Sequence, residues 1–147
     1  MPTETSVRHL LDLRAIEQLK YDYCWAYDTA DIDTLVDLFT TDAVCELGAF
    51  GTFTGTDAIR AGYASIMANT GIPGSRRHLP GNPQIDISGD RANGRWYLLD
   101  LRTEQGAAQP VRIVATYADT YARVGEVWRI ARTSLTIEWL EPDWPRP

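Results

Sequence analysis

The stretch that decides the fold runs from residue 16 to residue 44 and reads IEQLKYDYCWAYDTADIDTLVDLFTTDAV. It begins within an apolar pattern of three- and four-residue steps that extends upstream to Leu10 and ends at Tyr27. Such spacing is typical of one face of a helix, and Ser6 can cap its start. The sequence therefore predicts a helix over residues 6–27.

The same stretch then indicates a second, short helix and a strand. Asp31 is a suitable N-cap for a helix over residues 31–39, which has an apolar face. Residues 40–48 are typical of a strand, and residues 49–55 are its predicted hairpin partner. A third helix is predicted over residues 57–68.

The second half of the chain is dominated by strand patterns. Two prolines interrupt the first extended segment at residues 80–83, because proline cannot donate to a strand ladder. The segments predicted as strands are residues 76–88, 91–103, 111–124 and 127–140. Helices first and long antiparallel strands afterwards indicate one α+β domain over residues 1–147, with helices on one face of a curved sheet and a proline-broken tail at 141–147.

Length and charge limit the classes of function. The chain has 147 residues, 44% of them hydrophobic. A domain of this size buries roughly 68–70% of its unfolded surface, which allows a core with an internal cavity. The 20 acidic residues against 14 basic ones give a net charge of −6, and Lys20 is the one lysine. A nucleic-acid-binding surface needs clustered lysine and arginine, so this class of partner is excluded.

Membrane segments, disulfides and metal sites are not indicated either. No apolar run reaches the roughly 18 residues that span a bilayer, and the first residues lack the basic-then-apolar order of a signal peptide, so we expect a cytoplasmic protein. Cys24 and Cys45 are too isolated for a disulfide framework. Because the sequence has no CxxC, HExxH or Cys/His cluster, we expect no metal site.

Polar residues near the end of the first helix are the first candidates for chemistry. Tyr23 and Tyr27 are four positions apart and share a helix face, and Asp28 follows where the helix is expected to end. Tyrosines at such positions are more often packed in the core, and an aspartate there is more often a cap. His78 opens a strand, and a histidine becomes a general base near neutral pH where a carboxylate holds its tautomer. Asp28 could supply that carboxylate if the helix end and the strand start meet at one pocket.

Three further polar residues lie on predicted strands. Asp100 and Arg102 alternate with apolar leucines, so the sequence favours the solvent face of the sheet for both. Arg132, on the last predicted strand, fits a surface ion pair and a functional position equally well.

Several segments together resemble a known family. They are residues 16–44, GTFTGTDAIR (51–60), RHLPGNPQI (77–85), GDRANGRWYL (89–98) and VATYADTYARVGEVWRIAR (114–132). Over about residues 13–137, the chain resembles the SnoaL-like branch of the nuclear transport factor 2-like superfamily. The resemblance implies a cone-shaped α+β fold, in which a strongly bent, mixed or antiparallel sheet wraps around a pocket closed by three helices. Such a pocket suits a hydrophobic, cyclic small molecule.

Within that superfamily, scytalone dehydratase, bile-acid 7α-dehydratase and hexachlorocyclohexane dehydrochlorinase use a His–Asp pair for elimination. The resemblance places their aspartate at Asp28 and their histidine at His78. It also places a polar pocket residue at Tyr23, and at Tyr27 the tyrosine that precedes the aspartate in scytalone dehydratase. Leu47 stands where ketosteroid isomerase keeps its carboxylate base, which argues against an isomerase of that type.

We therefore hypothesise a cofactor-independent lyase of the dehydratase type, or a related cyclase or isomerase, for a hydrophobic cyclic hydroxylated compound. His78 would take a proton from carbon while Asp28 orients its ring. Tyr23 or Tyr27 would hydrogen-bond the departing hydroxyl or a developing enolate. The residues expected to bind the substrate are Tyr27, Trp25, Phe53, Trp96, Ile113 and Arg132.

Two alternatives from other classes remain open. One is a non-catalytic small-molecule binding or assembly domain that uses the same cone. The other is a structural protein resembling the small subunit of ring-hydroxylating dioxygenases. An open, mainly apolar cavity with Asp28 and His78 at its floor would favour the enzyme. The resemblance also implies a homodimer or a higher homo-oligomer, because sheet faces in this fold often pair.

Overall fold

The computed structural model describes residues 4–69, 75–103, 106 and 108–141, and within them lie three α-helices and six strands. The helices are α1 (Glu4–Asp28), α2 (Ile32–Asp37) and α3 (Thr56–Asn69). The strands are β1 (Phe39–Glu46), β2 (Thr52–Thr54), β3 (Arg76–Ser88), β4 (Arg91–Arg102), β5 (Val111–Val124) and β6 (Val127–Leu140). A 3-10 turn, η1 (Gly48–Phe50), lies between β1 and β2.

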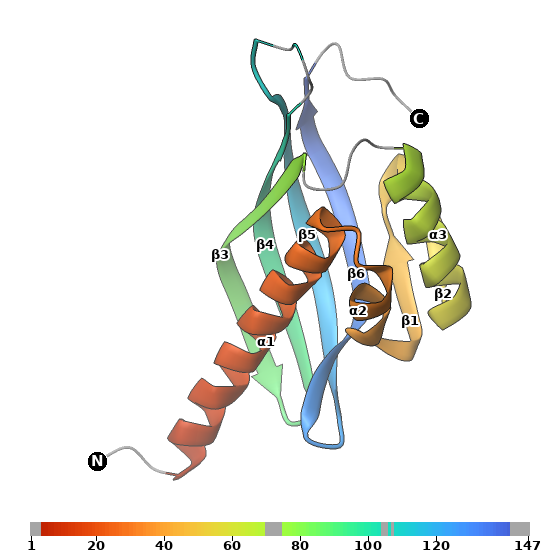
Figure 1. Ribbon diagram of the computed structural model, residues 1–147. Helices are drawn as coiled ribbons and strands as arrows, with labels where there is room; N and C mark the ends of the chain where they lie inside the picture. Colours follow the sequence, from red (N-terminus) through yellow and green to blue (C-terminus); the bar gives the residue numbers. More distant parts are fainter. Residues whose placement is uncertain (1–3, 70–74, 104–105, 107, 142–147) are drawn as a thin grey trace.

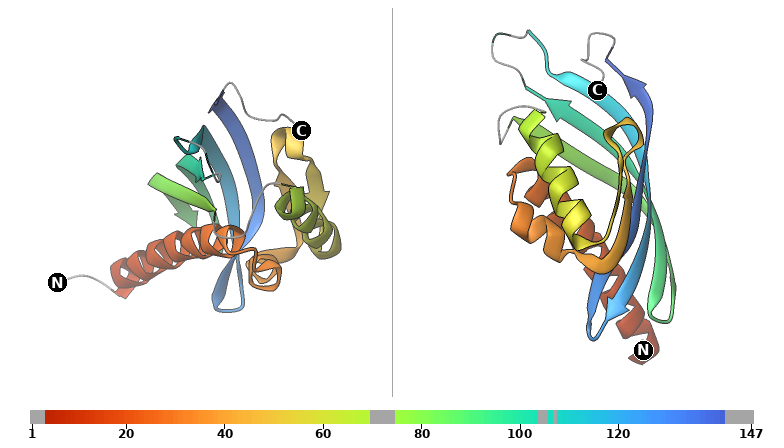
Figure 2. Two further views of the ribbon diagram at one scale, coloured as in Figure 1. Left: turned by 45° about the horizontal axis from the view of Figure 1, so that its top comes forward. Right: turned by 90° about the vertical axis from the view of Figure 1, so that its right-hand side faces the viewer.

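The strands form one sheet in the order β2-β1-β6-β5-β4-β3. Neighbouring strands are antiparallel except β1 and β6, which are parallel, so the sheet is mixed. Helix α1 crosses one face of the sheet and packs mainly on β3, while α3 packs on β1 (Figure 1). Figure 2 shows the sheet curving toward the helices. The predicted α+β class with a curved mixed sheet is confirmed, and no helix in the described residues is long and apolar enough to cross a membrane.

The second helix is shorter than the sequence predicts, because its last residues join the sheet. Asp31 caps it as predicted, since its Oδ1 accepts a hydrogen bond of 3.1 Å from the backbone N–H of Thr34. The backbone N–H of Ile130 in β6 donates to the carbonyl of Leu38 at 2.8 Å. Phe39 therefore belongs to β1, where it pairs with Ile130, and not to the helix.

The prolines do not break β3. The register between β3 and β4 shifts between Gly81 and Gln84, and Asn82 adopts a left-handed backbone with φ of 51°. Such a β-bulge lets a strand accommodate residues that cannot donate to the ladder. The predicted interruption is thus an irregularity inside one strand, and His78 on its near side pairs with Asp100 of β4.

The core between the sheet and the helices is strongly aromatic. Its largest fully buried side chains include Trp96, Tyr63 and Tyr121. Gly62 of α3 brings the helix backbone close to the ring of Phe53 in β2: a Cβ at Gly62 would lie 2.5 Å from three ring atoms. Real Cβ atoms do not approach other atoms so closely, so the glycine is required by packing.

Gly62→Ala is expected to lower the free energy of unfolding by about 1–3 kcal/mol, because the Phe53 ring or α3 must shift. This loss outweighs the gain in helix propensity of up to about 1 kcal/mol that alanine brings. Urea denaturation measures the change. Gly81→Ala is the matched control, because a Cβ there meets nothing within 4 Å. Equal stabilities of the two variants would contradict the packing argument.

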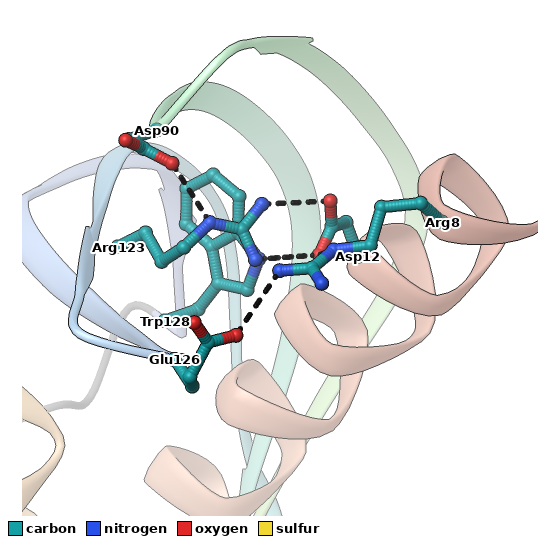
Figure 3. Close-up of polar contacts among 6 residues, drawn as sticks. All are labelled: Arg8, Asp12, Asp90, Arg123, Glu126 and Trp128. Carbon is teal, nitrogen blue, oxygen red and sulfur yellow. Dashed lines mark hydrogen bonds and ion pairs between the residues drawn. The ribbon is translucent and has the colours of Figure 1, made fainter. Parts of the chain in front are cut away.

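A polar cluster fixes the first half of α1 to the turns of two hairpins (Figure 3). Arg123 of β5 donates to both carboxylate oxygens of Asp12 at 2.9 and 2.7 Å, and to Asp90 at 2.9 Å. Its guanidinium carbon lies 4.5 Å from the ring centroid of Trp128, whose indole N–H donates to Asp12 at 3.1 Å. We name this group the anchor cluster, and its members are Arg8, Asp12, Asp90, Arg123, Glu126 and Trp128.

The anchor cluster makes the free energy of unfolding depend on pH in the acidic range. Its Arg123 hydrogen bonds lower the pKa of Asp12 from 3.8 to about 2. Because the folded-state pKa lies below the unfolded-state value, the stabilisation is present above pH 4 and is lost as the pH falls through about 2. With allowance for solvent screening, Asp12→Asn should lower the free energy of unfolding by about 1–2 kcal/mol at neutral pH, measured by urea denaturation across pH.

Glu126→Gln is the control for this prediction, because the Glu126 side chain is 87% exposed and pairs only with Arg8 in the anchor cluster. Its effect should stay within about 0.5 kcal/mol. The difference in the free energy of unfolding between wild type and Asp12→Asn should shrink as the pH falls toward 2. A difference that stays the same over this pH range would contradict the stabilising role of the charged Asp12 carboxylate.

Candidate functional site

A small cavity lies between the second half of α1, α3 and the inner face of the sheet. Its volume is about 40 Å³, which is room for a few water molecules. Apolar side chains form much of its wall, and the polar side chains in its lining are Tyr23, Tyr27, Tyr63, Arg76, His78, Asp100 and Tyr117. The polar groups of the site come from α1, α3 and three strands, so the folded chain alone brings them together.

A second, larger hollow adjoins this cavity. It measures about 650 Å³ and lies between η1 and the second half of β6. The side chains that line both spaces are Phe50, Ile113, Leu135 and Ile137. The cavity and the hollow thus share a wall of apolar side chains.

Asp28 and His78 form a hydrogen-bonded pair, in which His78 lines the cavity and Asp28 lies behind the lining. Asp28 is the last residue of α1, and His78 lies near the start of β3. Oδ1 of Asp28 is 2.5 Å from Nδ1 of His78, and Oδ2 accepts the backbone N–H of His78 at 2.9 Å. His78 therefore binds both carboxylate oxygens of Asp28, and this carboxylate in turn fixes the orientation of the imidazole ring. A proton on Nδ1 leaves Nε2 as the basic atom of His78.

Asp100 stands on the other side of the imidazole. Its Oδ2 lies 3.7 Å from Nε2 of His78, and both side chains are largely buried. Its Oδ1 has no hydrogen-bond partner among the residues that the structure describes, although it is buried. No group of three or more His, Cys, Asp or Glu side chains in the described ranges could hold a metal ion. The histidine is thus flanked by two carboxyl groups: both oxygens of Asp28 are bound by His78, whereas Oδ1 of Asp100 has no hydrogen-bond partner in the described residues.

The expectation that Asp100 and Arg102 face solvent was wrong, because the two residues are only 8% and 7% exposed. Exposure alternates strictly along most of β4, and the even-numbered side chains point inward. Leu98 and Leu99 are adjacent apolar residues of opposite phase, so the sequence pattern did not reveal which set is buried.

Three tyrosines from different elements meet in the lining: Tyr23 of α1, Tyr63 of α3 and Tyr117 of β5. The hydroxyls of Tyr23 and Tyr63 are 2.8 Å apart, and the ring of Tyr23 meets the rings of Tyr63 and Tyr117 edge to face. Burial raises the pKa of all three phenols well above 10. This tyrosine cluster (Tyr23, Tyr63 and Tyr117) therefore stays neutral and can donate hydrogen bonds.

Tyr27 and Arg76 border the imidazole. The ring centroid of Tyr27 is 4.6 Å from that of His78, and its hydroxyl accepts a hydrogen bond of 2.8 Å from Nη1 of Arg76. Arg76 is 8% exposed, so a guanidinium lies in the same lining as the Asp100 carboxyl group. The positive charge offsets part of the negative charge of the site.

Among the residues expected to bind the substrate, Tyr27 and Ile113 line the cavity. Trp25 does not line the cavity and is 70% exposed. It lies two positions before Tyr27, and residues two apart in a helix point to nearly opposite faces. Trp96 is buried, but the structure places it behind the lining, where its Nε1 donates to the hydroxyl of Tyr121 at 3.0 Å.

Phe53 and Arg132 also lie away from the cavity lining. The ring of Phe53 packs against that of Tyr63, with centroids 6.5 Å apart, and forms a layer behind the wall. The side chain of Arg132 is 47% exposed and forms an ion pair of 2.5 Å with Glu46. Arg132 thus makes the surface ion pair that the sequence left open as one of two possibilities.

Sequence reasoning missed four polar residues of the lining: Tyr63, Arg76, Asp100 and Tyr117. Tyr117 lies four positions after Ile113 on the same predicted strand, so strand alternation places both side chains on one face, and this signal could have found Tyr117. Asp100 becomes a neighbour of His78 only through the register of β3 on β4, which the sequence does not specify.

Comparison with known proteins agrees with this fold. A family model of the SnoaL-like domain matches residues 8–134. An uncharacterised protein of Mycobacterium tuberculosis is 30% identical over 129 residues, which are 86% of each chain. A candidate scytalone dehydratase from Novosphingobium aromaticivorans has a solved structure that is 26% identical with a TM-score of 0.81, over 94% of this chain and 91% of that one. A hexachlorocyclohexane dehydrochlorinase from Novosphingobium barchaimii, 21% identical with a TM-score of 0.81 over 92% of each chain, shares the fold.

Proposed function

This chain belongs to the SnoaL-like domain family, and we propose that it acts as a lyase of the dehydratase type, or as a related isomerase or cyclase, on a hydrophobic cyclic hydroxylated molecule. The observation that carries the proposal is the row Asp28–His78–Asp100, with contacts of 2.5 and 3.7 Å across the imidazole. Two carboxyl groups around one histidine suit the removal of one proton and the delivery of another. The likeness to a candidate scytalone dehydratase supports the lyase class.

The first step of the proposed elimination is proton removal from carbon. Nε2 of His78 takes a proton from the carbon next to a carbonyl group of the substrate, and the C–H electron pair moves into an enolate. Asp28 stabilises the resulting imidazolium through the Nδ1 contact of 2.5 Å. The chain positions this base rigidly, because the backbone of His78 also binds Asp28.

The second step is the loss of the hydroxyl group. The Asp100 carboxyl group gives a proton to the leaving oxygen, which departs as water while the enolate closes to a conjugated enone. The proton on Nε2 of His78 then passes to the Asp100 carboxylate across the gap of 3.7 Å once the side chains approach, which restores both groups. Substrate is thus converted to enone and water with no net change in the protein.

The tyrosine cluster provides donors for the oxygen that becomes negative. Its phenols are neutral because burial raises the pKa of each, so they can hydrogen-bond an enolate oxygen without carrying charge themselves. Donors that are fixed before the reaction stabilise a developing charge more strongly than mobile water does.

A cyclic substrate needs more room than the 40 Å³ of the cavity. We propose that it enters from the adjoining hollow of about 650 Å³ and displaces the shared apolar side chains, Phe50, Ile113, Leu135 and Ile137. Rotation of side chains, without movement of the sheet, would then join the two spaces.

The small volume of the cavity is also the observation that favours a second candidate function. A domain that binds a small molecule or assembles with partners, without chemistry, has no need of an open reaction chamber. Under this alternative, Asp28, His78 and Asp100 form a buried polar network that only stabilises the fold.

A turnover screen separates the two functions. Purified protein is incubated with β-hydroxy derivatives of cyclohexanone, decalone and steroid ketones, and enone formation is followed by ultraviolet absorbance. We expect conversion above the buffer rate, with Asp100→Asn slower by about 10²-fold because it cannot protonate the leaving oxygen. Asp86→Asn, at an exposed position of β3, is the matched control and should retain the wild-type rate. Ligand binding without any conversion would contradict the lyase and favour the binding domain.

A further inference from the structure

Lys20, the one lysine of the chain, lies fully buried behind the cavity wall. Its Nζ is 2.9 Å from Oδ2 of Asp119, and neither side chain is exposed. Asp119 is held in turn by the hydroxyls of Tyr121 and Thr133, which donate to it at 2.8 and 2.7 Å. The ammonium group therefore has a fixed position and a fixed counter-ion.

The same ammonium group lies against two aromatic rings of the tyrosine cluster. Nζ of Lys20 is 3.3 Å from the ring centroid of Tyr117 and 4.7 Å from that of Tyr23. Both rings line the cavity, whereas Lys20 does not. These two tyrosines therefore lie between the ammonium group of Lys20 and the cavity.

A cation at the face of a phenol ring strengthens the phenol as a donor. The attraction between the cation and the ring grows as the ring gains electron density. The ring gains electron density when the hydroxyl proton of the tyrosine moves toward an acceptor. Burial acts in the opposite direction, since it raises the pKa of Tyr23 and Tyr117 well above 10. The ammonium group offsets part of that effect without placing a charge in the cavity itself.

We infer that Lys20 is a positioning residue that strengthens the hydrogen bonds donated by Tyr23 and Tyr117, so that the cavity selects ligands with an acidic or developing anionic oxygen. This inference rests on the proposed function and names its substrate class: ketones that enolise, enols and phenols. The oxygen of such a molecule lies at the tyrosine cluster while its acidic C–H bond faces His78.

Binding of 2-naphthol and of naphthalene, measured by calorimetry, tests the inference without any turnover. Substituted 2-naphthols with electron-withdrawing groups extend the series to more acidic hydroxyls, which are ionised to a larger extent at the pH of the assay and so present the anionic oxygen that the tyrosines would bind. The variant Lys20→Met/Asp119→Asn removes both charges of the buried pair together, so that no carboxylate is left without its counter-ion. Lys20→Arg keeps a cation at the same place and is the conservative control.

The double variant is expected to bind the most acidic naphthol about tenfold more weakly than wild type, 2-naphthol less so, and naphthalene equally well. Lys20→Arg should retain most of the wild-type preference. In a Tyr117→Phe background the effect of the double substitution should shrink, because one of the two phenols through which it acts is gone.

An equal loss of affinity for naphthol and naphthalene would show a merely structural role and overturn the inference. So would an unchanged preference in the double variant, or a wild-type chain that binds 2-naphthol no better than naphthalene. Failure of the proposed elimination has a different signature, which is intact naphthol selectivity without enone formation. The two proposals can therefore fail separately.

Discussion

His78→Gln is expected to lower the rate of enone formation by about 10²–10⁴-fold, the usual range for the loss of a general base. Glutamine has no basic ring nitrogen to accept the proton from carbon. It keeps the backbone N–H that donates to Asp28 at 2.9 Å, so the end of α1 stays attached to β3. Initial rates with the best substrate of the turnover screen measure the effect, which should fall on kcat more than on KM because the tyrosine cluster is intact.

His9→Gln is the matched control, since His9 is the other histidine of the chain and lies exposed on α1. Its rate should equal that of wild type. If His78→Gln retained the wild-type rate, or if both variants lost activity to the same extent, the general-base role of His78 would be contradicted.

Lys20→Met is expected to lower the free energy of unfolding by about 3–5 kcal/mol, because it leaves the carboxylate of Asp119 charged and buried without its counter-ion. Both side chains are completely inaccessible to solvent, so water cannot replace the lost ammonium group. The hydroxyls of Tyr121 and Thr133 still donate to Asp119, but they carry no charge. Denaturation by urea, followed by tryptophan fluorescence, measures the change.

The double variant Lys20→Met/Asp119→Asn should recover most of this stability, because it removes the stranded charge. Recovery would show that the damage comes from the unpaired carboxylate and not from the shape of methionine. A single variant as stable as wild type, or a double variant less stable than the single one, would contradict this explanation.

The fold could be predicted well because its elements have long, regular patterns. The helix expected over residues 6–27 is α1 (Glu4–Asp28), and all four long strands lie close to their expected positions. The errors occur where tertiary contacts decide the outcome. Phe39 leaves the second helix because β6, far along the chain, pairs with it, and no local pattern reveals that pairing.

The candidate site could be predicted only in part. The family resemblance pointed to Asp28 and His78, which the structure brings into contact. Asp100 was assigned to solvent because adjacent leucines concealed the phase of β4. Trp25 and Trp96 were included because aromatic residues line pockets, yet the same residue types fill cores and exposed helix faces. The type of a residue does not tell where its side chain points, whereas its position along the helix turn or in the strand register does.

The central claim is that His78, held by Asp28, removes a proton from carbon inside the cavity. Exchange of the acidic C–H protons of 2-tetralone in deuterated water, followed by proton NMR, tests this step directly, because 2-tetralone is an apolar cyclic ketone with no hydroxyl to lose. Wild type should accelerate the exchange above the buffer rate, and His78→Gln should return it to that rate. Exchange at equal rates in the presence of wild type and His78→Gln would contradict the claim.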